Sequence, residues 1–138
     1  MAKVVIFGVK DTAELAHFYL THDTEHDVVA FTVHQDYIED SYFKGLPVVA
    51  FENIENYYPS DKFKMFAPMT AKNMNRLRES VYDEVTRKGY EFVSYISSKA
   101  TVYDESRIGK NCFILEDNTI QPFTSIGNNV VLWSGNHI

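Results

Sequence analysis

Residues 94–138 read SYISSKATVYDESRIGKNCFILEDNTIQPFTSIGNNVVLWSGNHI, and this stretch decides the fold. Every sixth residue in it is aliphatic: Ile96, Val102, Ile108, Ile114, Ile120, Ile126, Leu132 and Ile138. Because Ile, Val and Leu make up about one residue in five of the chain, eight hits in one frame would arise by chance only on the order of a few times per million. The repeat therefore predicts a left-handed parallel β-helix, running from near residue 96 to the last residue.

The repeat also predicts how this β-helix is built. Three hexads, or about 18 residues, form one triangular coil, and each short strand stacks on its equivalent in the next coil. The aliphatic residues point inward, and the position two before each of them, as in Ala100 and Cys112, is mostly small enough for a tight corner. Gly109 and Gly127 each follow an aliphatic position, where a turn needs a permissive backbone.

Residues 1–93 follow a different pattern, in which strand-like and helix-like segments alternate. Apolar runs predict buried strands at 3–9, 27–33, 46–51, 62–69 and 90–95. The Pro in the third run suggests a strand start or a sheet edge. The polar and aromatic segment 34–44 is interpreted as a loop. This order predicts an α/β domain with a parallel, Rossmann-like sheet over residues 1–93, followed by the start of the β-helix over 94–138.

Two helices are expected in this first part. One begins at a capping box from Asp11 to Glu14 and ends near His22, with Leu15, Ala16, Phe18 and Tyr19 as its apolar stripe. The other starts at Thr70 or Asn73 and ends before Gly89, which suits a residue just past a helix end. Its apolar face contains Leu77, Val81 and Val85.

Composition excludes several classes of function. A formal net charge of -6 argues against a nucleic-acid partner, since phosphate binding needs basic patches. No apolar stretch approaches the roughly 20 residues of a membrane helix, and the chain opens directly on a strand without signal-peptide architecture. The single cysteine, Cys112, cannot form an internal disulfide. These features predict a cytoplasmic protein.

An α/β domain joined to the repeats of residues 94–138 resembles the sialic acid O-acetyltransferase type of sugar acyltransferases. That family includes N-acetyltransferases of nucleotide-linked amino sugars such as bacillosamine precursors. The resemblance covers essentially the whole chain. It implies a first domain that holds a UDP- or dTDP-amino sugar, acetyl-CoA along the β-helix between subunits of a homotrimer, a histidine base on an early coil, and no metal. The implied reaction moves an acetyl group from acetyl-CoA to an amine or hydroxyl of the sugar, in surface glycan biosynthesis.

Carried over by position, the resemblance points to Gly8, Lys10 and Asp36 for substrate binding. Gly8 matches the first glycine of the family's turn after the first strand, although Val9, Lys10 and Asp11 replace the rest of the pattern. A helix N-terminus here can offer N–H groups to phosphate, whereas Asp11 opposes an anion. A plain strand-to-helix turn is therefore the alternative interpretation. Asp36 partly matches an acidic pair that follows the family's second strand.

His137 is the catalytic candidate, because it is the only histidine in the repeat region. In the family the base usually lies in the hexad that would begin after residue 138. His137 is therefore the base itself, a residue beside it, or a corner residue facing solvent or a neighbouring subunit. The other histidines, which lie in the first domain, are expected at the surface: His17, His22, His26 and His34.

The repeat ends on an inward-pointing residue, Ile138. Solenoids need a polar cap at each open end, and the α/β domain is expected to cap the start. We therefore hypothesise a shortened form of a longer enzyme. A non-catalytic nucleotide-sugar-binding module, or an inactive fragment, is the alternative. A zinc hydratase would need about three histidine ligands and the repeats supply one, while an NAD enzyme would need the full glycine fingerprint after Gly8.

Overall fold

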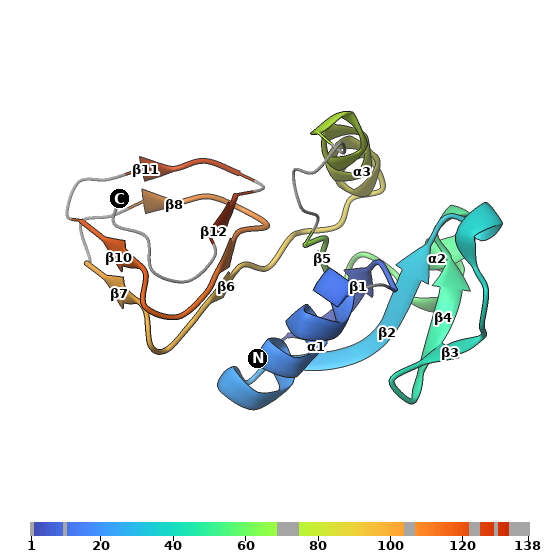
Figure 1. Ribbon diagram of the computed structural model, residues 1–138. Coiled ribbons are helices and arrows are strands. Elements are labelled where there is room, and N and C mark those ends of the chain that lie inside the picture. Colours follow the sequence, from blue (N-terminus) through green and yellow to red (C-terminus); the bar gives the residue numbers. More distant parts are fainter. Residues whose placement is uncertain are drawn as a thin grey trace.

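The computed structural model describes residues 2–9, 11–68, 75–103, 107–121, 125–128 and 130–132. Figure 1 shows a twisted sheet with helices beside a triangular coil of short strands. Within the described residues, no helix is both long and apolar enough to span a membrane.

The sheet is built mostly from parallel strands, as the buried apolar runs predicted. Its order is β3-β4-β2-β1-β5. The parallel strands are β1 (Lys3–Phe7), β2 (Asp27–Val33), β4 (Leu46–Ala50) and β5 (Lys64–Phe66). Side chains alternate between the two faces, so Val4 and Ile6 belong to one apolar cluster while Val5 and Phe7 belong to another.

Each face of the sheet is covered by different elements. Helix α1 (Asp11–Asp23) buries Ala13, Ala16 and Leu20 on the face that carries Val4. The other face is covered by η2 (Phe51–Asn53), α2 (Ile54–Tyr57) and α3 (Asn75–Arg87), which bury Phe51, Ile54, Val81 and Val85. The predicted stripe of α1 was wrong at Phe18, which is 54% exposed because Ala16 and Leu20 set the inward face.

Two segments differ from their predicted form. The loop predicted over 34–44 contains a short helix, η1 (Gln35–Tyr37), and an antiparallel edge strand, β3 (Tyr42–Phe43). Lys44 and Gly45 join β3 to β4 with φ values of 53° and 77°, the backbone of a tight hairpin turn. Between 90 and 94, only a single bridge from Phe92 to Met65 replaces the expected strand, because the chain leaves the sheet there for the β-helix.

The repeat region forms a parallel β-helix. Its strands are β6 (Tyr95–Ile96), β7 (Thr101–Val102), β8 (Arg107–Ile108), β9 (Phe113–Ile114), β10 (Thr119–Ile120), β11 (Ser125–Ile126) and β12 (Val131–Leu132). They stack in three flanks: β6 with β9 and β12, β7 with β10, and β8 with β11. Ile96 pairs with Ile114, Val102 with Ile120 and Ile108 with Ile126, so the predicted three-hexad coil is confirmed. Ile138 lies outside the described residues.

The interior of the β-helix is formed by the aliphatic positions and the corners between them. Ile114, Ile120 and Cys112 are fully buried, and burial raises the pKa of the Cys112 thiol. At the corner position Asn118, a buried polar side chain donates from its amide to the carbonyl oxygens of Leu115 and Leu132 at 2.8 and 3.2 Å. These bonds satisfy backbone acceptors that a corner would otherwise leave unpaired.

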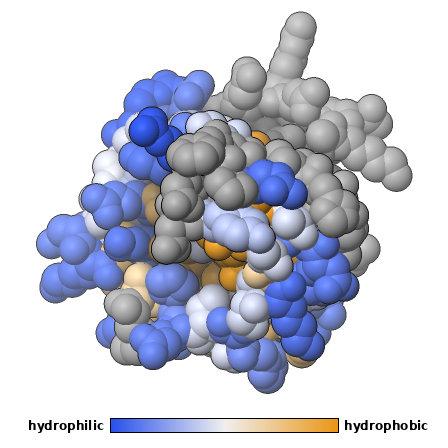
Figure 2. Space-filling model, turned by 90° about the vertical axis from the view of Figure 1, so that its left-hand side faces the viewer, coloured by the Kyte–Doolittle hydropathy of each residue, from blue (hydrophilic) through white to orange (hydrophobic). Residues whose placement is uncertain are grey.

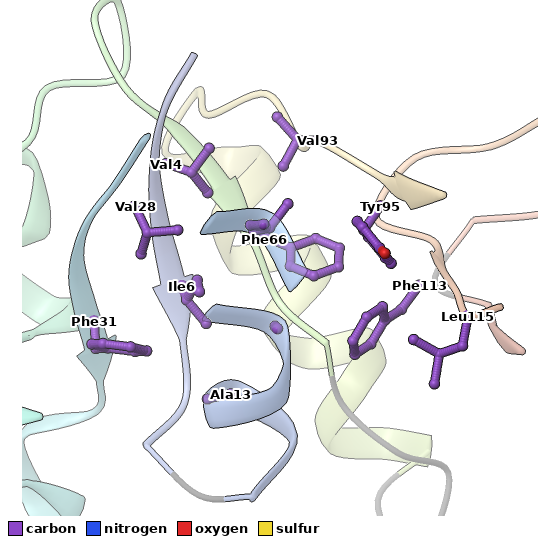
Figure 3. Close-up of a cluster of buried hydrophobic side chains, with 12 residues drawn as sticks. Val4, Ile6, Ala13, Val28, Phe31, Phe66, Val93, Tyr95, Phe113 and Leu115 are labelled. Carbon is purple, nitrogen blue, oxygen red and sulfur yellow. The ribbon is translucent and has the colours of Figure 1, made fainter. Parts of the chain in front are cut away.

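The α/β part packs against one flank of the β-helix, which corrects the expectation that it caps the first coil. The outward side chains of β6 and β9, Tyr95 and Phe113, join the apolar cluster of α1 and the sheet. Figure 3 shows both rings beside Phe66 of β5. Ile96 of the first coil, by contrast, is 37% exposed. Figure 2, viewed from the side of the β-helix, shows apolar surface near the middle of that face within a hydrophilic border.

Polar contacts fix the position of this junction. The carboxylate of Asp23, the last residue of α1, accepts hydrogen bonds from the Ser98 hydroxyl, the Ser98 N–H (2.8 Å) and the Tyr95 hydroxyl (2.7 Å). Together these donors lower the pKa of Asp23. The Tyr19 hydroxyl donates to Glu116 at 2.9 Å. The β-helix is therefore held to α1 at its C-terminal end.

Two glycines of the β-helix give a matched test of coil stacking. A Cβ at Gly109 would contact Asn128 Oδ1 and would lie 2.7 Å from the Gly127 carbonyl oxygen, whereas a Cβ at Gly127 would meet no atom of the described residues within 4 Å. We expect Gly109→Ala to lower the free energy of unfolding by about 1–3 kcal/mol, the usual cost of overpacking. Gly127→Ala should cost much less. Urea unfolding measures both, and equal losses would contradict this packing of the coils.

The Asp23 junction predicts a pH-dependent stability. Because its folded pKa is depressed below the ordinary value of 3.8, the ionised carboxylate stabilises the fold above that pH, and this contribution is lost as pH falls through the folded pKa. Asp23→Asn should lower the free energy of unfolding at pH 7 by up to about 1 kcal/mol, after allowing for solvent screening. The difference from the parent chain should shrink towards pH 3.

Asp27→Asn, at the exposed start of β2, controls for the change in net charge. Urea unfolding at both pH values provides the measurement. A gap between Asp23→Asn and the parent that stays constant from pH 7 to pH 3 would rule out the ionised carboxylate as its cause.

Candidate functional site

The carboxyl ends of β1, β2 and β5 form the candidate site. Strand β1 has β2 on one side and β5 on the other, although β5 follows β4 in the chain. The strand order therefore reverses at β1. In open parallel sheets, ligands bind outside the carboxyl ends of the strands at such a reversal.

Gly8 makes the turn from β1 into α1 at this edge. Its N–H donates to the Thr32 carbonyl oxygen at 2.9 Å, which ties the ends of β1 and β2 together. Its φ of 126° lies in a region that side chains of L-residues rarely adopt, and a Cβ there would lie 3.4 Å from the Ala13 Cβ. The turn brings the first N–H groups of α1 to the edge, where they can bind an anion. Lys10 lies outside the described residues.

His34, which directly follows β2, is held by three other elements. Its Nε2 lies 3.0 Å from Glu84 Oε2 of α3. Its ring packs edge-on against Phe7 of β1 and Phe51 of η2, with centroids 5.4 and 5.5 Å away. The expectation of a simple surface histidine was therefore wrong, because α3 and the aromatic rings enclose most of the side chain.

The acidic residues near the end of β2 differ from the expected arrangement. Asp36 is exposed on η1, three residues beyond β2. The carboxylate anchored at this edge is that of Glu52, from η2, whose Oε1 accepts the Gln35 N–H at 3.0 Å. Burial alone would raise the pKa of Glu52, but hydrogen bonds from its own N–H and that of Gln35 lower it. Glu52 was missed because it follows a different strand; an acid directly after the apolar run 46–51 was the signal available.

The end of β5 is bound by a residue of the β-helix. Asn111 Oδ1 accepts the Ala67 N–H at 2.8 Å, and Asn111 Nδ2 donates to the Ala67 carbonyl oxygen at 2.9 Å. Ala67 directly follows β5. The candidate site therefore lies where the sheet and the β-helix meet, a juxtaposition that no local sequence pattern signals.

The remaining histidines that the structure describes do not join this site. His137, the predicted catalytic residue, lies outside the described residues. His17 and His26 are half-buried and hydrogen-bonded or ring-packed within the α/β part, and burial is the main cause that lowers their pKa values. His22 is exposed, as expected. Over the described ranges, no group of three or more His, Cys, Asp or Glu side chains is arranged to hold a metal ion.

A cavity of about 630 Å³ lies at the opposite edge of the sheet. It is lined by residues at the amino ends of β1 and β5, including Lys3, Lys62 and Lys64. Lys64 is paired with Glu91 at 3.4 Å. Because ligands of parallel sheets bind at the carboxyl ends, we do not include this cavity in the candidate site.

Residues 105–138 match the bacterial transferase hexapeptide family (six repeats). No curated protein matches the chain. Solved structures match over nearly its whole length. The acetyltransferase domain of PglB from Neisseria gonorrhoeae FA1090 has a TM-score of 0.76 at 16% identity, covering 100% of this chain and 65% of that one. The same domain in complex with acetyl coenzyme A has a TM-score of 0.75 at 15% identity, covering 99% and 63%.

PerB from Caulobacter crescentus, in complex with CoA and GDP-perosamine, has a TM-score of 0.76 at 21% identity, covering 99% of this chain and 64% of that one. The chain thus spans somewhat less than two thirds of the length of these structures. At these low identities, TM-scores of 0.75 and 0.76 show that the chain shares the fold of these proteins. Residues 105–138 carry the bacterial transferase hexapeptide repeat, and the chain as a whole has the fold of hexapeptide-repeat sugar acetyltransferases.

Proposed function

We propose that the chain is an acyltransferase that moves an acetyl group from acetyl-CoA to an amine or hydroxyl of a nucleotide-linked sugar, in surface glycan biosynthesis in the cytoplasm. One observation carries the proposal: Asn111, on a turn of the β-helix, is hydrogen-bonded to Ala67 at the carboxyl edge of the parallel sheet, beside the Gly8 turn. A nucleotide held at that edge would place its sugar next to the β-helix. The likeness to PglB, solved with acetyl coenzyme A, and to PerB, solved with CoA and GDP-perosamine, supports it.

In this proposal residues 1–93 form a Rossmann-like nucleotide-sugar domain. The N–H groups at the start of α1, presented by the Gly8 turn, bind the diphosphate, and Lys10 adds a positive charge. Carboxylates near the end of β2, Asp36 or the anchored Glu52, accept hydrogen bonds from ribose hydroxyls. A UDP-, dTDP- or GDP-linked amino sugar has the groups that this arrangement would recognise.

Residues 94–138 then form the start of a left-handed β-helix that binds acetyl-CoA between the subunits of a homotrimer. The sugar nitrogen or oxygen attacks the thioester carbonyl, the CoA thiolate leaves, and a base accepts the proton of the attacking group. Backbone N–H groups stabilise the negative oxygen that forms during attack. His137 is our candidate for the base.

The activity can be tested directly. Incubation of the chain with acetyl-CoA and a panel of UDP-, dTDP- and GDP-amino sugars should release free CoA thiol and give an acetylated sugar, detected by mass spectrometry. His137→Asn should lower kcat about 100-fold or more, the usual contribution of a general base. His22→Asn, on the exposed face of α1, provides the control. Nucleotide-sugar binding without turnover would favour the non-catalytic module, and neither binding nor turnover would contradict both functions.

The position of the nucleotide site can be tested by calorimetry with UDP, dTDP and GDP. An Ala side chain does not suit the φ of 126° at Gly8, so Gly8→Ala should displace the turn and the start of α1. We expect the Kd of the preferred nucleotide to rise about tenfold, or about 1.4 kcal/mol. Lys62→Ala, in the cavity at the opposite edge, should leave the Kd unchanged. The reverse pattern would move the nucleotide site to that cavity.

A further inference from the structure

Asn111 joins the two parts of the candidate site in an unusual way. Its amide group both accepts from and donates to the backbone of one residue, Ala67, at 2.8 and 2.9 Å. Asn111 is only 4% exposed, and Ala67 is equally buried. The pair of bonds imitates the contact that a neighbouring strand would make, so it fixes the orientation of the Ala67 peptide groups as well as their distance.

Ala67 lies at the point where the sheet order reverses. Ile6 of β1 pairs with Phe66 of β5, so Ala67 follows directly after the last paired residue, level with the end of β1. Gly8 turns away from the sheet immediately beyond this point. The side chain of Asn111 therefore contacts the carboxyl end of the β1–β5 pair. A ligand of this sheet would bind just beyond that end.

The turn that carries Asn111 is itself firmly held. Asn111 has a φ of 56°, which Asn tolerates better than most residues. On one side, the Lys110 N–H donates to Asn128 Oδ1 at 2.7 Å, one coil further along. On the other side, Ser94 Oγ accepts the Cys112 N–H at 2.9 Å and donates to the Gly109 carbonyl oxygen at 3.0 Å. Because this turn is held on both sides, it cannot follow a displacement of Ala67. Such a displacement would therefore break the hydrogen bonds between Asn111 and Ala67.

We infer that Asn111 is a positioning residue for acetyl transfer: it fixes the carboxyl end of β5 against the β-helix, so that a sugar carried at that edge faces the acetyl donor. This inference rests on the proposed function. Asn111 need not touch the substrate, since it acts through the Ala67 backbone. Its loss should therefore reduce kcat while leaving nucleotide affinity nearly intact, because misplacement of reacting groups by about 1 Å can cost up to about a hundredfold in rate.

Asn111→Gly is the main test, because glycine accepts the positive φ and removes only the amide. Asp117→Gly is the matched control: Asp117 is exposed on another β-helix turn and has a similar φ of 63°. We expect Asn111→Gly to lower kcat about tenfold to a hundredfold, with the Kd for the nucleotide sugar within about twofold of the parent. Asp117→Gly should match the parent in both. Thermal unfolding confirms that each variant is folded.

Asn111→Asp provides a second, pH-dependent reading. A protonated carboxyl group at this position can still donate to the Ala67 carbonyl oxygen, whereas an ionised one cannot. Its kcat relative to the parent chain should therefore recover as pH is lowered from 8 to 6, since burial beside a carbonyl favours the protonated form. A general loss of folding would not give this profile.

The outcomes separate the inference from the proposed function. A parent chain that binds no nucleotide sugar and acetylates none contradicts the proposed function, and the positioning role with it. An active parent with an equally active Asn111→Gly variant contradicts the positioning role alone. So does a variant whose nucleotide affinity falls in step with kcat, because Asn111 would then shape the nucleotide site itself.

Discussion

The packing of Phe113 and Tyr95 against the sheet is the contact on which the rest of the structure depends. The ring centroid of Phe113 lies 5.5 Å from that of Phe66 of β5 and 5.7 Å from that of Tyr95, in edge-to-face arrangements that aromatic pairs prefer. All three rings are essentially buried. Because they belong to one apolar cluster with α1, the α/β part and the β-helix share a core. The bonds made by Asp23 and Asn111 then fix how the two parts are oriented.

The same contact explains which part of the fold could be predicted from sequence. The inward residues of a β-helix recur every sixth position, so the coil and its pairing followed directly from the repeat. The outward residues recur with a period of about 18, because each flank receives only every third hexad. On one flank the outward residues are apolar, namely Tyr95, Phe113 and Val131. The outward residues are Thr on the second flank, and Arg and Ser on the third. A repeat of six residues does not distinguish the three flanks, which is why the α/β part was expected to cap the start of the β-helix instead of packing against one flank.

The candidate site was less predictable for a related reason. Gly8 was identified from its match to the first glycine of the family's turn, a pattern local in sequence, and its φ of 126° is one that other residues rarely adopt. The contacts of His34, Gln35 and Ala67 join residues 50, 17 and 44 positions apart, so they depend on the folded arrangement alone. Asp36 partly matched a family pattern, but η1 places it in solvent, and Glu52 of η2, which follows another strand, is anchored instead. Lys10 and His137 remain predictions.

The charges at the carboxyl edge constrain how a nucleotide sugar could lie there. The carboxylates near the end of β2 include those of Asp36, Glu52 and Glu84, which suit hydroxyl donors and repel phosphate. The diphosphate would therefore lie on the other side of this edge, against the N–H groups at the start of α1, with the ribose towards β2. A sugar linked to the far phosphate would then continue away from β2, past β1 and towards β5. Asn111 holds the end of β5 against the β-helix on that side, so the electrostatics of the edge and the junction favour the same path for the acceptor.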